Sequence, residues 1–151
     1  MNQSISYPQV EVDKFQAITL LPIDVNAVLE AARNIEAGAM VTFTGTVRAG
    51  SHGKTATGLW YEAYTEMSET MMCQILKDAR EKFALIDAFC QHRIGELKVT
   101  DVAVIVVTTS VHRKEAYDAN QYIIDRVKFE LPIWKKEYYT DETSKWSHNF
   151  H

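Results

Sequence analysis

Cysteine is scarce in this sequence, whose 151 residues include only Cys73 and Cys90. Their spacing matches neither a zinc-binding pattern nor a Cys-x-x-Cys redox motif. Isolated free cysteines usually behave as small buried apolar residues. We therefore predict that both cysteines are structural and that neither takes part in catalysis.

Long apolar runs are also missing. No segment approaches the roughly 20 consecutive apolar residues that span a bilayer, and the N-terminus lacks a charged region followed by an apolar one. These two absences favour a cytoplasmic protein with no membrane attachment.

Basic residues are not in excess, since 16 lysines and arginines face 20 acidic residues and the formal net charge is -4 at pH 7. Proteins dedicated to nucleic-acid binding usually carry a clear positive excess, which displaces counterions from the phosphates. We therefore predict no nucleic-acid partner. Any site for an anion must depend on a local group of basic side chains.

Several catalytic signatures are absent as well. The sequence contains no glycine-rich phosphate-binding loop, no His-Glu-x-x-His motif and no Gly-x-Ser-x-Gly motif. Its five histidines are dispersed without the spacing of metal ligands. The familiar hydrolase mechanisms and a resident metal ion are thus not indicated.

The sequence has the composition of an average soluble protein, 46% hydrophobic and 24% charged. We predict a single domain at 14–139, between a flexible arm at 1–13 and a polar tail at 140–151. Alternating apolar residues predict strands at 14–21, 40–47, 59–64, 86–94, 102–109 and 133–139. Helical spacing of apolar residues predicts helices at 24–38, at 65–83, and from Ser110 to the break at Pro132.

These elements do not alternate regularly, which favours an α+β fold with a largely antiparallel sheet. The strands at 40–47 and 59–64 are expected to form a hairpin around a glycine-rich loop. The strand at 102–109 is β-branched almost throughout, which predicts a central strand buried on both faces. Gly95 and Glu96 are expected to form a turn. The predicted helix N-caps are Asp24, Thr65 or Ser68, and Ser110.

The helix that begins at Ser110 concentrates the candidate chemistry, because it carries basic groups at both ends. His112 and Arg113 lie at its start, where backbone N–H groups and the helix dipole attract anions. Lys128 lies near its end. Solvated basic side chains on a capped helix explain the same pattern equally well.

Lys135 follows the helix and stands beside Trp134, which could bury its aliphatic stem. Burial would lower the pKa of Lys135 and make it a useful acid, base or nucleophile near neutral pH. Most surface lysines are simply solvated. Each of these basic residues is therefore also consistent with a solvent-exposed side chain that has no functional role.

Five motifs, in this order, resemble the catalytic large subunit of molybdopterin synthase over roughly residues 15–146. They are Phe43-Thr44-Gly45-Thr46-Val47-Arg48, Tyr61-Glu62-Ala63-Tyr64 leading to Met67, His92-Arg93-Ile94-Gly95-Glu96-Leu97, Ser110-Val111-His112-Arg113, and Lys128 followed by Pro132-Ile133-Trp134-Lys135-Lys136-Glu137. The resemblance implies an α/β-hammerhead-like fold and a sulfurtransferase of molybdenum-cofactor biosynthesis.

The resemblance also implies substrates and partners. The protein would form a homodimer, and each copy would bind a small ubiquitin-like sulfur carrier, which gives a heterotetramer. The carrier's C-terminal Gly-Gly, as a thiocarboxylate, would deliver sulfur to cyclic pyranopterin monophosphate and yield molybdopterin. Both reactants are anions, so the site needs fixed positive charge and proton transfer rather than a cofactor or metal.

The resemblance assigns roles to residues that match the family's motifs. It implies catalytic roles for Lys128 and Lys135. The residues implied to bind substrate are Thr46, Val47, Arg48, His112, Arg113, Lys136 and Glu137.

The length of the helix constrains these roles. Arg113 and Lys128 are fifteen residues apart, which separates them by roughly 22 Å along a helix axis. One pterin-sized substrate cannot span that distance. We therefore hypothesise a composite site, with Lys128, Lys135 and Arg48 from one protomer and His112 and Arg113 from the other. The alternative function is a non-catalytic module that binds a ubiquitin-like tail or a phosphate-bearing ligand.

Overall fold

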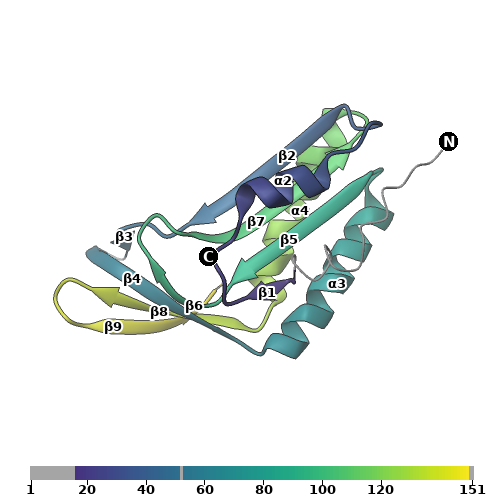
Figure 1. The fold of residues 1–151 in the computed structure, drawn as a ribbon. Coiled ribbons are helices and arrows are strands. Elements are labelled where there is room, and N and C mark those ends of the chain that lie inside the picture. The colour runs from purple at the N-terminus through teal and green to yellow at the C-terminus, as the bar shows by residue number, and fades with distance from the viewer. Residues whose placement is uncertain (1–15, 52, 150–151) are drawn as a thin grey trace.

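In the part of the chain that the structure describes, the strands form two sheets, with helices packed mainly on the first (Figure 1). The computed structural model describes residues 16–51 and 53–149. The predicted arm at 1–13 lies outside these residues, as does the beginning of the predicted strand at 14–21. The α+β class with mainly antiparallel pairing is confirmed.

The first sheet has the strand order β1-β5-β7-β2. Its members are β1 (Ile18–Thr19), β5 (Asp87–Arg93), β7 (Val102–Ser110) and β2 (Ala39–Thr46). β1 runs parallel to β5, whereas β7 is antiparallel to both of its neighbours. Three helices accompany this sheet in the described part of the chain, namely α2 (Val25–Ala32), α3 (Thr65–Lys82) and α4 (Arg113–Glu130).

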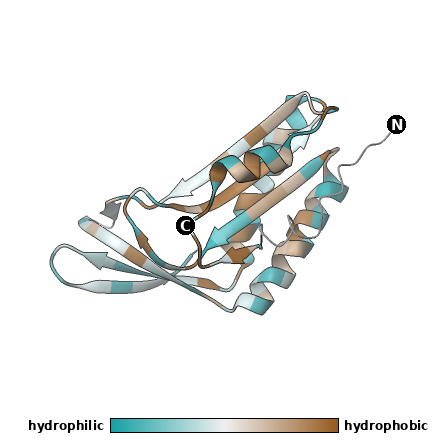
Figure 2. Ribbon diagram, in the orientation of Figure 1, coloured by the Kyte–Doolittle hydropathy of each residue, from teal (hydrophilic) through white to brown (hydrophobic). Residues whose placement is uncertain are grey.

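β7 is buried on both faces, as its β-branched sequence predicts. Val104 and Val106 join the larger core with α3 and α4, whereas Ile105 and Val107 pack against Val28 of α2. Figure 1 shows α2 in front of this sheet and α4 behind it, and Figure 2 shows apolar stretches where β7 passes α2. Each such side chain contributes about 1.5–3 kcal/mol when it is fully removed from water.

α4 packs on this sheet through the face that the helical periodicity predicts. The buried residues of that face and of the helix exit are Ala116, Ala119, Asn120, Ile123, Val127 and Leu131. The helix N-cap is His112 rather than the predicted Ser110. Ser110 is the last residue of β7, and its hydroxyl donates to the carbonyl of His112 instead. The strand therefore passes into the helix through a tight turn.

The other two helices begin where the sequence predicts, but only α3 also ends there. The carboxylate of Asp24 caps α2 by accepting a hydrogen bond from the N–H of Ala27, at 3.0 Å. This helix ends at Ala32 and does not extend to Gly38, which instead lies against the backbone of Val111. α3 begins at Thr65 with Tyr64 as its N-cap, and no side chain caps it. The predicted caps of this helix are therefore wrong.

The second sheet has the order β3-β4-β8-β9, with β6 paired to β4. Its strands are β3 (Gly50–Ser51), β4 (Lys54–Ala63), β6 (Gly95–Lys98), β8 (Ile133–Tyr139) and β9 (Ser144–His148). Gly95 begins a strand instead of the predicted turn. Its φ of 91° is readily adopted by glycine and lets the chain leave β5 of the first sheet for β6 of the second.

The predicted hairpin of 40–47 with 59–64 is wrong. β2 pairs with β7 in the first sheet, while β4 pairs with β6 and β8 in the second. Both strands form their ladders with partners far away in the sequence, and alternation of apolar residues does not identify a distant partner. The glycine-rich segment between them contains the short strand β3, which pairs with the start of β4.

The predicted polar tail at 140–151 contains β9, which pairs with β8 along 144–148. The turn before it is held by Asp141, whose carboxylate accepts from the N–H and hydroxyl of Thr143. Glu142 has a positive φ of 69° in this turn. Figure 2 shows that β9 is mainly hydrophilic, and this composition hides the strand from a search for apolar alternation.

Candidate functional site

A pocket of about 260 Å³ lies where the two sheets meet. Its walls come from the end of β2, from facing parts of β4 and β8, from the end of α4, and from the segment after β9. Of the nine residues that sequence analysis assigns to a site, the pocket brings together six: Thr46, Val47, Arg48, Lys128, Lys135 and Glu137.

Lys128 reaches this pocket from the last turn of α4. Burial lowers its pKa to about 8, and the positive charge of Lys135 acts in the same direction. Its ammonium donates a hydrogen bond to Oδ1 of Asn149 at 3.1 Å. A lysine with this pKa exists in both protonation states near neutral pH, so it can accept or donate a proton.

Lys135 and Glu137 enter the pocket from β8. Successive strand residues point to opposite faces, so residues two apart share a face. The Nζ of Lys135 lies 3.4 Å from Oε1 of Glu137, and only 17% and 7% of their side-chain surfaces are exposed. The partner carboxylate keeps this buried lysine next to a compensating charge.

Trp134 does not bury Lys135, contrary to the sequence-based prediction. The Trp134 ring lies on the other face of β8, where it contacts the rings of Tyr64 and His148. The pKa lowered by burial belongs to Lys128. Adjacent residues of a strand point to opposite faces, so Trp134 cannot cover Lys135.

Tyr61 on β4 supplies a neutral hydroxyl to the pocket. Burial, together with the nearby Glu137 carboxylate, raises the pKa of Tyr61 to about 12. The hydroxyl therefore stays protonated near neutral pH. Glu137 also accepts a hydrogen bond from the hydroxyl of Tyr139 at 3.3 Å. The pocket floor thus combines hydroxyl donors with one carboxylate.

The end of β2 forms another wall. Val47 is buried, and its N–H donates to the carbonyl of Asp101 at 3.0 Å, while its own carbonyl accepts from Thr100 at 2.7 Å. These bonds fix the backbone on both sides of Val47. Thr46 and Arg48 are exposed at the pocket, where the arginine adds a permanent positive charge.

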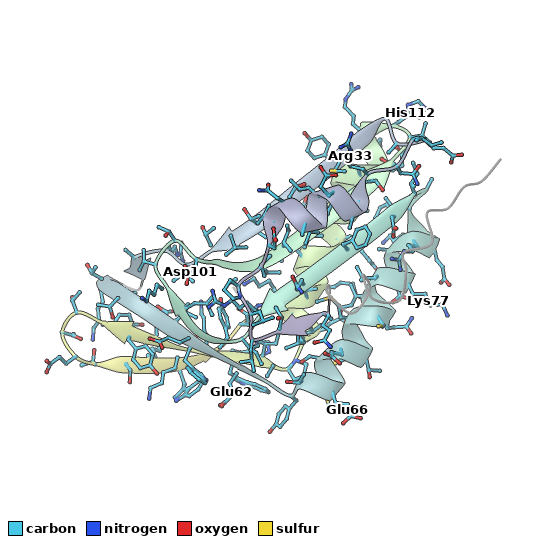
Figure 3. The ribbon with its side chains drawn as sticks, in the orientation of Figure 1. Arg33, Glu62, Glu66, Lys77, Asp101 and His112 are labelled. Carbon is cyan, nitrogen blue, oxygen red and sulfur yellow. The ribbon has the colours of Figure 1, made fainter. Side chains whose placement is uncertain are left out.

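Three predicted site residues lie elsewhere. His112 and Arg113 are exposed at the far end of α4, and Figure 3 shows His112 well away from Glu62 of β4. Lys136 lies on the outer face of β8, where its Nζ is 5.8 Å from the ring centre of Trp146. A single chain therefore does not bring these three cations together with Lys128, and for His112 and Arg113 this is what the helix length predicts.

Asn149 is a pocket residue that sequence reasoning missed. It is 2% exposed, and its amide lies between Lys128 and the buried His92. It stands in a segment whose polar composition predicts a tail. Only the pairing of β9 with β8 carries Asn149 back to the pocket, so no local signal in the sequence reveals it.

Comparison with known proteins gives consistent matches. The model of the family described as MoaE protein matches residues 18–130. The molybdopterin synthase catalytic subunit of Bacillus subtilis is 42% identical over 130 residues, which cover 86% of this chain and 82% of that protein. Its counterpart in Thermoplasma volcanium is 37% identical over 135 residues, covering 89% and 98%.

A solved structure shares the fold as well as the sequence. The crystal structure of molybdopterin synthase from Staphylococcus aureus superposes with a TM-score of 0.82 at 42% identity. The match covers 87% of this chain and 95% of that one. The similarity in fold therefore extends over most of both chains.

Proposed function

The chain belongs to the MoaE protein family, and from this membership we propose that it is the catalytic subunit of a molybdopterin synthase. In this proposal it transfers sulfur from the thiocarboxylate of a small ubiquitin-like carrier to cyclic pyranopterin monophosphate. The single observation that best supports the proposal is the pocket that unites Lys128, Lys135 and Arg48.

The charges of this pocket suit two anionic reactants. Arg48 and Lys135 supply positive charge for a phosphate and a thiocarboxylate, and such charge is most effective in a site that is partly shielded from water. With a pKa of about 8, about a tenth of Lys128 is neutral at pH 7. Lys128 can therefore take a proton in one step and return it in another.

The walls of the pocket also suit the end of a carrier. Ala56 has a small side chain, and Gly58 presents only backbone here because its missing Cβ would point at the carbonyl oxygen of Leu97 on β6, so an extended glycine tail can approach this part of β4. We propose that the carrier's C-terminal Gly-Gly occupies this part. The name of the relatives, catalytic subunit, fits an enzyme that requires a second subunit.

We propose further that the protein works as a homodimer with composite sites. A groove between β2 and α4 is bordered by Phe43, Tyr117 and Phe129, which are 38%, 62% and 65% exposed, and Lys128 also lines it. A second copy packed antiparallel along α4 would cover these apolar side chains. It would bring its own His112 and Arg113 toward the pocket.

Heterodimer complementation tests this composite arrangement. A Lys128→Ala protein and an Arg113→Ala protein, each inactive alone, should regain part of the activity when their subunits exchange, because one site of the heterodimer is intact. The absence of any recovery, once exchange is verified by native mass spectrometry, would refute the shared site.

We also propose a cytoplasmic location. Both cysteines are free, as is usual for proteins in reducing compartments. None of the helices in the described part of the chain is long and apolar enough to cross a membrane.

A reconstituted reaction tests the proposed function directly. Purified protein, thiocarboxylated carrier and cyclic pyranopterin monophosphate should yield a dithiolene product, detected after oxidation as a fluorescent pterin. The matched control is carrier whose C-terminus is an ordinary carboxylate, and it should give no dithiolene product. Binding of the carrier without product would favour the alternative of a non-catalytic module and overturn the proposal.

A further inference from the structure

Asn149 links the pocket lysine to a buried histidine. Its side-chain Oδ1 accepts from Nζ of Lys128 at 3.1 Å, and its Nδ2 lies 2.9 Å from Nε2 of His92. Its backbone N–H separately donates to the carbonyl of Ile133 at 3.0 Å. The backbone therefore anchors the chain after β9, which leaves the side-chain amide for a different task.

The histidine determines which way this amide points. Nδ1 of His92 lies 2.8 Å from the carbonyl oxygen of Arg93, which can only accept, so Nδ1 carries the hydrogen. Burial, together with the positive charge of Lys128, lowers the pKa of His92 to about 3. The ring is thus neutral near pH 7, and its Nε2 is an acceptor.

An acceptor at Nε2 requires the NH2 group of Asn149, and this leaves the oxygen of the amide for Lys128. The reversed amide would place its NH2 against the lysine ammonium and its oxygen against the lone pair of the ring. Two hydrogen bonds would become two repulsive contacts in a buried site. The tautomer of His92 therefore determines that the Asn149 oxygen, and not its NH2 group, contacts Lys128.

We propose that Asn149 is a positioning residue for Lys128, and that the neutral ring of His92 fixes the orientation of the Asn149 amide. Lysine is a long side chain with many rotamers, and a single fixed acceptor selects those that hold Nζ at the pocket. The catalytic consequence rests on the proposed function, whereas the geometry does not.

The amide also affects the protonation of Lys128. An acceptor favours the charged form, so it opposes the effects of burial and of Lys135. The other ionisable groups around this site are Arg48 after β2, Tyr61 on β4, Cys90 and His92 on β5, and Lys135 and Glu137 on β8. A change at Asn149 leaves all of these side chains in place, although it also removes the hydrogen-bond donor to Nε2 of His92.

The first test uses the unmodified protein. In wild-type protein labelled with 15N-histidine, NMR should show His92 as the neutral tautomer with hydrogen on Nδ1 from about pH 5 to pH 8. A hydrogen on Nε2, or a charged ring in that range, would overturn the proposal, because the amide could then not be oriented as described.

The second test measures the pKa of Lys128 by NMR of 13C-labelled lysine, with Lys128→Gln to assign the signal. Removal of the acceptor in Asn149→Ala should lower this pKa by about one unit. Asn34→Ala is the matched control, because it removes an asparagine outside the pocket whose Oδ1 accepts from the N–H of Glu36. The pKa of Lys128 should be unchanged in this variant. An unchanged pKa in Asn149→Ala would contradict the positioning role.

Activity provides the third readout. Sulfur transfer by Asn149→Ala should lose about tenfold in kcat, with a smaller change in KM for the pterin, because ground-state binding by Arg48 remains. If the wild-type protein transfers no sulfur, the proposed function fails, while the tautomer and the pKa still decide the positioning role. A wild-type kcat in Asn149→Ala would overturn the catalytic part.

Discussion

The burial of His92 predicts a specific dependence of stability on pH. The imidazole is fully buried, and desolvation lowers its pKa from 6.5 to about 3 in the folded protein. Below about pH 6.5, His92 therefore binds a proton in the unfolded chain but stays neutral in the folded protein. Since the folded pKa is the lower one, the stabilisation is complete above the unfolded pKa and is lost as pH falls toward 3.

The magnitude follows from these two pKa values. At about pH 5 the unfolded state gains about 2 kcal/mol from protonation of this one histidine, whereas at about pH 7 it gains almost nothing. The free energy of unfolding should thus fall by about 2 kcal/mol between these pH values on account of His92 alone. This is a large part of the stability of an ordinary domain.

Urea unfolding at several pH values from about 7 to 5 measures this effect. His92→Gln removes the titrating group and keeps a polar side chain, so its stability should vary less with pH than that of the wild type, by about 2 kcal/mol over this range. His148→Gln removes a histidine that is only partly buried, and it should retain the wild-type dependence. Parallel curves for wild type and His92→Gln would refute the reasoning.

Three further predictions concern other parts of the structure. Gly38→Val should destabilise the fold by about 1–3 kcal/mol in urea unfolding, because a Cβ at Gly38 would lie 2.3 Å from the carbonyl oxygen of Val111; a neutral effect would contradict the close approach. Asn120→Leu should cost about 1–3 kcal/mol, because the Asn120 amide donates to carbonyls of β2 and β7 at 3.1 and 3.0 Å; unchanged unfolding would show that these bonds contribute little. Single-turnover sulfur transfer should titrate with an apparent pKa near 8, the value of Lys128; the same titration in Lys128→Gln would rule out this lysine as its source.

The sequence predicts elements whose signal is local. The β-branched run at 102–109 predicts the doubly buried strand β7, and the helical spacing after Ser110 predicts the buried face of α4. The length of α4 alone predicts that Arg113 and Lys128 do not meet in one protomer. Each of these conclusions depends on periodicity or on rise per residue, which neighbouring residues determine.

The errors in strand pairing and in the site concern features that depend on distant contacts, whereas the wrong helix caps are local errors. β2 and β4 are close in the sequence but belong to different sheets, and β9 has too few apolar residues to be recognised as a strand. The lowered pKa belongs to Lys128 because the second sheet covers the end of α4. Asn149 enters the site only through the pairing of β9. Burial of this kind is a tertiary property that local patterns do not contain.

The rate of sulfur transfer in Lys128→Ala tests the central claim most directly. Thiocarboxylated carrier is mixed with wild-type or variant protein and the cyclic pterin, and loss of the thiocarboxylate is followed by mass spectrometry, while carrier affinity is measured separately. We predict a loss of at least about 100-fold in rate. Carrier affinity should be nearly unchanged, because Lys128 transfers protons and does not hold the carrier in place. Wild-type rates in Lys128→Ala, with folding and carrier binding intact, would contradict the account.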